Sequence, residues 1–391
     1  MKVAQFLASL DTSPTACKAI VRIAQIAPPF VRIPPARYGG TERVVHVLTE
    51  ELVRRGHDVT LFAAGTCETT AHLHPVCPRP LWEMGAADPL AIRVLQVEEV
   101  VRRSGEFDVL HSHVDYLPWL AGDRLRAPLV TTLHGRLDLP ELRPLFHAYR
   151  GQALVSISNA QRRPLADLAL NWVATVHHGL NLDETYRLGS GRGGYLVFLG
   201  RIAPEKDPVT AIRVAIQAGL QLKIAARVDS VDAQYFQTQV EPLLGHPLIE
   251  WVGELDDRGK AELLEGALAL LMPVAWDEPF GLVFIEALAA GTPVISRPRG
   301  SIPELIRHGA HGFLAETDDE LVEACRAANL VDRAGCRRHA LTRFSASRMV
   351  DDYERVYRAL ARDQLQQSSL VELPSSSHLD ARQASIAQTG T

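Results

Sequence analysis

Short apolar stretches rich in β-branched residues alternate with amphipathic stretches along most of the chain. In residues 41–55, valine and leucine recur at helical spacing, which predicts a helix with one apolar face. Gly56 ends that helix, and residues 57–63 follow as a predicted strand. Such alternation of strands and helices indicates an α/β fold, in which parallel sheets are covered by helices on both faces.

The predicted strands form two series with a glycine-rich segment between them. The first domain begins near Val21, and its strands are residues 57–63, 108–111, 129–132 and 153–157. The second series is residues 195–200, 222–226, 249–252, 269–272 and 293–296. The intervening segment GSGRGG at 189–194 is typical of a flexible linker. A length of 391 residues also fits two domains better than one, and we predict domains of residues 21–185 and 186–345.

The two ends of the chain have a different pattern. Residues 1–20 hold an apolar run that is too short for a signal peptide, and we expect a poorly ordered extension there. A helix with an apolar stripe is predicted over residues 346–362. Residues 363–391 are rich in Ser, Gln, Ala and Thr, and we expect a disordered tail.

Composition excludes several classes of protein. The net charge is −5, whereas a protein that binds nucleic acid is normally basic. The five cysteines are scattered without a CxxC pair, which argues against a disulfide framework and a structural zinc site. No apolar stretch approaches the roughly 20 residues that span a membrane. We therefore expect a cytoplasmic globular protein.

Ligands of parallel α/β sheets bind at the carboxyl ends of the strands, in the loops that lead to the next helix. One such loop holds Gly39 and Gly40 before the first predicted helix, where paired glycines and a helix N-terminus can admit an anion. Another holds Arg201 and Lys206 at the start of the second series, where two cations could bind a diphosphate. A tight turn and solvated surface cations are the alternative interpretations of these two loops.

A third loop contains two glutamates eight residues apart, Glu278 and Glu286. A helix is predicted to open near Phe280 and to end at Gly291. Its first turn leaves three backbone amides without intrahelical partners, those of Gly281, Leu282 and Val283. Carboxylates on both sides of such amides suit a ligand with hydroxyls at both ends and phosphate between them. For either glutamate alone, an interaction with the helix dipole is the alternative.

This segment resembles the E-x7-E element of the retaining glycosyltransferases of family 4, which have the GT-B fold: two Rossmann-like domains facing a central cleft. The resemblance covers roughly residues 21–362. It includes, in order, Gly39 and Gly40, His-Ser-His at 111–113, Thr-Leu-His-Gly at 132–135, Ser158 and Asn159, residues 179–183, Gly200 and Arg201, Lys206, residues 252–254 and residues 291–294. In that fold a C-terminal helix crosses back to the first domain, and the stripe over residues 346–362 suits this position.

The resemblance also implies roles for individual residues. Glu286 would hold the ribose hydroxyls, Glu278 would hold hydroxyls of the donor sugar, and His134 would lie beside the sugar ring and take part in catalysis. Cations, amides and the glycine turn would bind the donor diphosphate: Arg201, Lys206, Gly281, Leu282, Val283, Gly39 and Gly40. The base would lie near Val252, Gly253 and Glu254.

We predict neither a metal site nor a cofactor. No D-x-D motif suited to a Mg²⁺–diphosphate bridge follows a predicted strand. We expect His111 and His113 to point to opposite faces of their strand, with no third ligand at a suitable spacing. Two cations and a helix dipole would stabilise the leaving diphosphate instead. Asp207 follows Lys206 where the family pattern has glycine, and its carboxylate could weaken the charge of the lysine.

The expected activity is metal-independent transfer of a hexose from a nucleotide sugar, in cell-envelope or exopolysaccharide synthesis. UDP-glucose and GDP-mannose are the leading donors, and the acceptor stays open among glycans, lipid-linked acceptors and small molecules. Arg143, His147 and Arg150 would suit peripheral contact with the inner face of a membrane, although a solvated helix face explains them too. A catalytically silent partner subunit with the same fold is the alternative. Neither half has the G-x-G-x-x-G motif of an NAD-dependent dehydrogenase.

Overall fold

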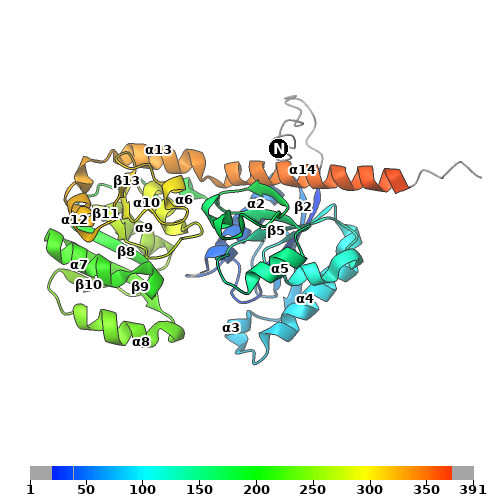
Figure 1. Ribbon diagram of the computed structural model, residues 1–391, viewed down its shortest axis with the longest axis horizontal. Helices are drawn as coiled ribbons and strands as arrows, with labels where there is room; N and C mark the ends of the chain where they lie inside the picture. Colours follow the sequence, from blue (N-terminus) through cyan, green and yellow to red (C-terminus); the bar gives the residue numbers. More distant parts are fainter. Residues whose placement is uncertain (1–19, 38, 372–391) are drawn as a thin grey trace, which may run out of the picture.

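The computed structural model describes residues 20–37 and 39–371, with side chains as far as residue 362. These residues form two lobes joined side by side, each built around a parallel sheet (Figure 1). The strand order is β3-β2-β1-β4-β5-β6-β7 in the first sheet and β10-β9-β8-β11-β12-β13 in the second. The predicted α/β fold with two Rossmann-like domains is confirmed.

The strands of the first sheet are β1 (Arg22–Ile26), β2 (Asp58–Ala64), β3 (His72–Cys77), β4 (Val109–Ser112), β5 (Leu129–Leu133), β6 (Ala153–Ser156) and β7 (Trp172–Thr175). Those of the second are β8 (Tyr195–Ile202), β9 (Gln221–Val228), β10 (Ile249–Trp251), β11 (Ala269–Met272), β12 (Val294–Ser296) and β13 (Gly312–Leu314). The central strands are mostly apolar and buried because helices cover both faces of each sheet, although β1, β4 and β5 also bury polar side chains such as Gln25, His111 and Thr132.

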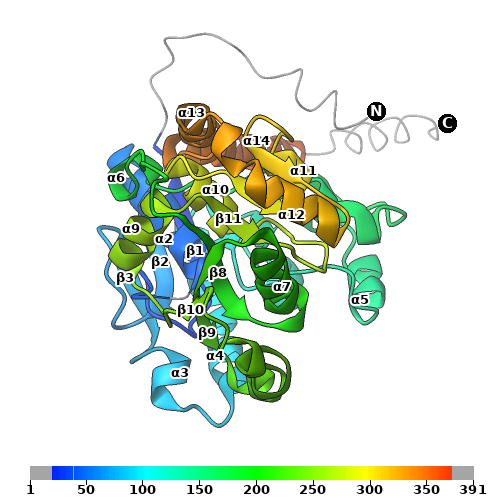
Figure 2. The same ribbon diagram turned by 90° about the vertical axis from the view of Figure 1, so that its left-hand side faces the viewer.

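The helices of the first domain are α2 (Gly40–Arg54), α3 (Leu81–Met84), α4 (Pro89–Arg103) and α5 (Leu142–Ala148), and α6 (Leu182–Thr185) follows them and packs on helices of the second domain. The others are α7 (Pro208–Ala218), α8 (Ala233–Tyr235), α9 (Asp257–Gly266), α10 (Leu282–Ala289), α11 (Ile302–Leu305), α12 (Asp318–Arg326), α13 (Arg333–Arg343) and α14 (Ala346–Val371). Helices α7 and α12 lie side by side on the outer side of the second domain (Figure 2). None of the helices in the described residues combines the length and apolar character needed to cross a bilayer.

The edge strands β3, β7 and β13 were absent from the sequence prediction. Residues of β3 and β7 are mostly half-exposed, and β3 contains a proline. An edge strand is paired on one side only and need not be a continuous apolar run, so the sequence gives little signal for it.

Helix α14 leaves the second domain after α13 and runs back across the first (Figure 1). Its side chains Met349, Tyr353 and Tyr357 are fully buried, and the helix packs on α2 and β4. The predicted crossover helix is thus confirmed. It continues to Val371, past residue 362, because the following Gln and Leu residues favour a helix. The expected extension before residue 20 and the rest of the expected tail lie outside the described residues.

Candidate active site

Two adjoining cavities lie between the domains, where the carboxyl ends of strands from both sheets meet. The smaller, of about 170 Å³, is lined by Glu286, and the larger, of about 440 Å³, by Glu278. They share six lining residues: Gly39, Gly40, Leu199, Gly200, Leu282 and Val283. The two glutamates therefore lie in one continuous groove, one in each half.

The start of helix α10 forms the middle of this groove. Gly281 caps the helix with a φ of 85°, and a Cβ there would lie 2.5 Å from the ring of Phe284. The amides of Leu282 and Val283 follow in the first turn, where helical amides have no intrahelical partner. Since the N-terminus of a helix carries positive partial charge, this part of the groove suits a phosphate.

The glycine turn of the first domain faces this helix start. Gly39 has a φ of 149°, and a Cβ on it would lie 2.7 Å from the Cβ of Pro35. A Cβ on Gly40 would lie 3.6 Å from Leu282 of the other domain. A side chain is therefore excluded at Gly39, whereas one at Gly40 would make an ordinary contact with Leu282. Both glycines line the groove, and their contact with the donor diphosphate stays a prediction.

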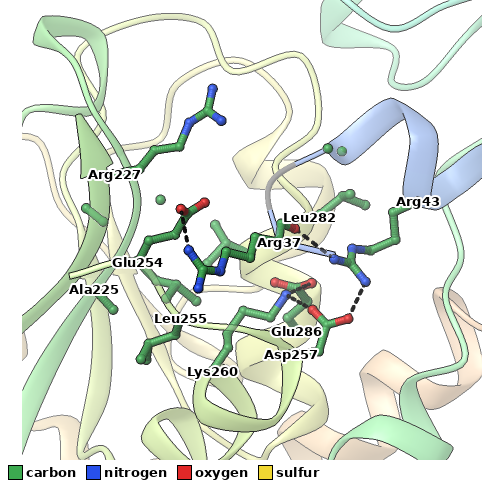
Figure 3. A pocket seen from close by; sticks show the side chains of 16 residues that line it. Arg37, Arg43, Ala225, Arg227, Glu254, Leu255, Asp257, Lys260, Leu282 and Glu286 are labelled. Carbon is green, nitrogen blue, oxygen red and sulfur yellow. Dashed lines mark hydrogen bonds and ion pairs between the residues drawn. The ribbon is translucent and has the colours of Figure 1, made fainter. Parts of the chain in front are cut away.

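The half of the groove with Glu286 contains a chain of charged side chains from both domains (Figure 3). Lys260 of α9 donates to Glu286 at 2.7 Å and lies 3.4 Å from Asp257. Asp257 accepts from Arg43 of the first domain at 2.6 Å. Sequence reasoning missed Lys260 and Arg43, because the only signal is their position near the start of a helix that follows a strand.

Of the three residues predicted near the base, only Glu254 lines this cavity. Glu254 lines it and lies 3.6 Å from Arg37 of the first domain (Figure 3). Val252 and Gly253 precede Glu254 and are not among its lining residues. In their place the wall is formed by the end of β9, with Ala225, Ala226 and Arg227.

Glu278 lies at the other half of the groove and is buried. Its carboxylate is ion-paired with Lys206 and accepts from the indole Nε1 of Trp276 at 3.0 Å. The Lys206 ammonium also lies 5.2 Å from the centroid of the Trp276 ring. The structure thus brings Lys206 to the groove, with its charge directed at Glu278.

Arg201 also lines the groove, but acidic side chains surround it. Its guanidinium is bonded to Asp232 and Glu205, and Asp229 lies 3.7 Å from it. The predicted contact with a diphosphate would therefore compete with these carboxylates. No sequence pattern indicates this arrangement, because Asp229 and Asp232 come from the segment after β9, far from Arg201 along the chain.

Asp207 does not pair with its neighbour Lys206. Its carboxylate accepts from the amide of Thr210 at 3.1 Å, which caps helix α7, and lies 3.3 Å from Arg297. Its φ of 53° lies in the left-handed region, which explains why glycine suits this position. Asp207 is thus the N-cap of α7, and Pro208 is its first residue.

His134 follows β5 and lines the groove, where it is half-buried. Its Nε2 is 2.9 Å from Nδ1 of His113, and its ring stacks on His178 with centroids 5.2 Å apart. Burial lowers the pKa of His134 to about 3, so the ring is neutral. Its Nδ1 has no hydrogen-bond partner among the described residues.

The prediction that His111 and His113 point to opposite faces is wrong. Their ring centroids are 4.0 Å apart, because residues two apart on an extended chain share a face. His111 bonds to Thr132 and Tyr357, each at 2.7 Å, and His113 bonds to Gln25 at 2.8 Å. The two rings therefore belong to a buried polar network that leads from α14 to His134.

Known proteins resemble the chain in both domains. The family model of glycosyl transferases group 1 matches residues 189–330, and that of glycosyltransferase family 4 matches residues 38–184. The phosphatidyl-myo-inositol mannosyltransferase of Mycobacterium leprae is 27% identical over 379 residues, 87% of this chain and 97% of that protein. The D-inositol 3-phosphate glycosyltransferase of Mycolicibacterium smegmatis is 27% identical over 366 residues, 79% of this chain and 81% of that protein.

Among solved structures, Anabaena Alr3699/HepE in complex with UDP and glucose has a TM-score of 0.66. It is 18% identical, and the match covers 90% of this chain and 100% of that one. At this identity the likeness shows a shared fold, in agreement with the two parallel sheets and the crossing helix.

Proposed function

Because the chain belongs to family 4 of the glycosyltransferases, with the GT-B fold, we propose that it transfers a hexose from a nucleotide sugar with retention of configuration and without a metal ion. The observation that carries the proposal is the order of groups along one groove: Glu286, the start of α10, and Glu278. A ribose, a diphosphate and a sugar follow each other in the same order in a nucleotide sugar.

The transition state of such a transfer resembles an oxocarbenium ion, and negative charge develops on the leaving diphosphate. The helix start at Leu282 and Val283 supplies amides and a positive dipole end for that charge. Lys206 adds a cation when it turns from Glu278 to the phosphate. Glu278 is then free to accept hydrogen bonds from the sugar hydroxyls.

Retention follows when the acceptor attacks from the face that the diphosphate leaves. The bond from the anomeric carbon to the diphosphate oxygen breaks, and the acceptor oxygen bonds to that carbon. The acceptor proton passes to the departing diphosphate. His134 is neutral, so its part is to hydrogen-bond and position the sugar rather than to carry charge.

UDP-glucose and GDP-mannose remain the two candidate donors. The name of the Mycobacterium leprae relative supports mannose, and the UDP and glucose bound to HepE support glucose. We place the reaction in the cytoplasm, where nucleotide sugars are supplied.

A panel of nucleotide sugars tests the activity and its metal requirement together. The release of nucleoside diphosphate from each donor is measured with and without EDTA, and the anomeric configuration of the product is read by NMR. We expect one clearly preferred donor, equal rates in EDTA and a retained anomer. Release from no donor would favour a silent partner subunit, and loss of activity in EDTA would contradict the metal-independent mechanism.

Replacement of Glu286 and His134 tests the assignment of the groove. Glu286→Ala removes a charged acceptor of ribose hydroxyls, so the KM for the donor should rise about 10- to 100-fold. His134→Ala should chiefly lower kcat, because the neighbouring sugar loses its positioning. Glu262→Ala is a matched control, since Glu262 is exposed on α9 and paired with Arg258. Unchanged kinetics in both groove variants would contradict the assignment of Glu286 to the ribose and of His134 to the sugar.

A further inference from the structure

The first domain forms one wall of the larger cavity, opposite the predicted donor groups. Its described lining residues are Val31, Gly39, Gly40, Thr41, Glu42, Trp82, His134, Gly135, Ile157 and His178. None of these is a lysine or an arginine. Neither Glu42 nor Trp82 belongs to the sequence motifs described above.

Glu42 is a buried carboxylate in the wall of this cavity. It lies in the first turn of α2 and is only 8% exposed, yet it lines the cavity. Within the described part of the chain, its carboxylate forms no ion pair and no hydrogen bond with another residue's side chain. Burial raises its pKa, as expected for an acid that lacks a compensating charge. Hydroxyl donors of a ligand would satisfy this carboxylate.

Trp82 adds a flat apolar surface to the same wall. It lies on the short helix α3 and is 61% exposed, with its ring 6.1 Å from that of Phe30. Because Trp82 lines the cavity, its exposed indole offers a flat apolar face to a ligand in it. An indole face and a carboxylate together fit a ring that presents C–H groups on one side and hydroxyls at its edge.

The charge of this region disfavours an anionic acceptor. The cations that line the cavity, Arg201 and Lys206, come from the second domain and are paired with carboxylates. Burial lowers the pKa of both His134 and His178, so neither ring supplies a positive charge. A phosphate on the acceptor would therefore meet the buried carboxylate of Glu42 without a cation from its own wall.

We propose that Glu42 and Trp82 form an acceptor subsite for an uncharged polyhydroxy ring, a saccharide or a cyclic polyol without phosphate on the ring that receives the sugar. The inference rests on the proposed function, since it names the acceptor of that transfer. It separates this chain from its two mycobacterial relatives, whose names state phosphorylated inositol acceptors.

Glu42 would act by holding a hydroxyl next to the one that reacts. The reacting hydroxyl gives its oxygen to the anomeric carbon and its proton to the departing diphosphate. Glu42 neither gains nor loses a proton in this step. Its effect is therefore on acceptor binding, and it is a binding residue.

An acceptor panel tests the class of acceptor. With the preferred donor, nucleoside diphosphate release is measured with methyl glucoside, maltose and myo-inositol, and with D-inositol 3-phosphate and vesicles that contain phosphatidylinositol. We expect kcat/KM for the best neutral acceptor to exceed that for either phosphorylated one by at least about tenfold. A phosphorylated acceptor that is used better than all neutral ones would overturn the proposal. If no donor releases diphosphate with any acceptor, the proposed function has failed instead.

Two variants test the subsite itself. Glu42→Gln and Trp82→Ala should each raise the KM for the neutral acceptor about tenfold, a larger factor than any rise in the KM for the donor. Trp82→Phe should restore most of the affinity, because it keeps an aromatic face. Glu83→Gln, on the exposed neighbour of Trp82, should leave both constants unchanged. A larger effect on the donor KM than on the acceptor KM would overturn the assignment of Glu42 and Trp82 to an acceptor subsite. If Glu42→Gln does not fold, the kinetics of Trp82→Ala alone test this assignment.

Discussion

The charge of Lys206 has two roles in this groove, one before and one after the donor binds. In the structure its ammonium pairs with Glu278, which also accepts from Trp276. The proposed mechanism requires that ammonium at the diphosphate while Glu278 binds the sugar. The ion pair keeps a buried carboxylate compensated until a donor enters, because an unpaired buried charge is costly.

The variant Lys206→Gln should lower kcat/KM for the donor roughly 100-fold, because it removes a cation that stabilises the leaving group and leaves Glu278 with the indole alone. Steady-state release of nucleoside diphosphate measures this effect. Lys223→Gln is the control, since Lys223 lies on β9 beside Glu250, away from the groove. A loss below about threefold would exclude Lys206 from transition-state stabilisation.

At the scale of elements, α14 does more than join the domains. The Tyr357 hydroxyl lies 3.1 Å from Nε2 of Gln25 and 2.7 Å from Nδ1 of His111. Gln25 in turn bonds to His113, which bonds to His134. The C-terminal helix therefore helps to fix the orientation and tautomer of the histidine beside the predicted sugar site.

Tyr357→Phe should lower the free energy of unfolding by about 1–3 kcal/mol, because buried partners at Gln25 and His111 lose their hydrogen bonds. It should also lower kcat with little change in the donor KM, since His134 lies at the end of the network. Urea denaturation and initial rates measure the two effects. Tyr149→Phe, a half-buried tyrosine outside the network, is the control. A variant with wild-type kcat would show that the network is structural only.

At the scale of the whole molecule, both sides of the cleft are bridged. Arg43 reaches Asp257 on one side. On the other, the backbone amides of Asn159 and Ala160 donate to Glu304 at 2.9 and 2.7 Å. His178 packs against Phe280 of the second domain with ring centroids 4.8 Å apart, so protonation of His178 would act on the packing of the domains.

The stability of the protein should depend on pH through these histidines. Burial lowers the pKa of His111, His113, His134 and His178, whereas each has a pKa of about 6.5 when unfolded. Below pH 6.5 the unfolded chain binds protons that the native chain does not, so acid favours unfolding. The free energy of unfolding should fall between pH 6.5 and 5 by up to about 1.4 kcal/mol per pH unit for each histidine.

Urea titrations at pH 8, 7, 6 and 5 measure this dependence. His178→Gln removes one titrating ring and should give a shallower slope over the acidic range. A slope that stays the same in this variant would contradict the attribution to His178.

Local patterns allowed most of the fold and part of the groove to be predicted. The central strands, the helix start at Leu282 and the glycine turn follow from residues adjacent in sequence, because period, caps and turns are local properties. Glu278 and Glu286 were found in the same way, since they flank one helix start.

The remaining groups of the groove come from separate segments. Glu42, Trp82 and Lys260 have no sequence pattern that distinguishes them from surface residues, and their common position appears only after both domains have folded. The acids around Arg201 were missed for the same reason.

Two α/β domains and the two glutamates around a helix start are predictable from the sequence alone, because both depend on spacing along one segment. Only the folded structure shows which charges meet: Lys206 with Glu278 within the second domain, and Arg43 with Asp257 across the cleft, while Glu42 has no ion pair among the described residues. Such pairings depend on distances between residues far apart in the chain, and only the packing of the two sheets sets those distances.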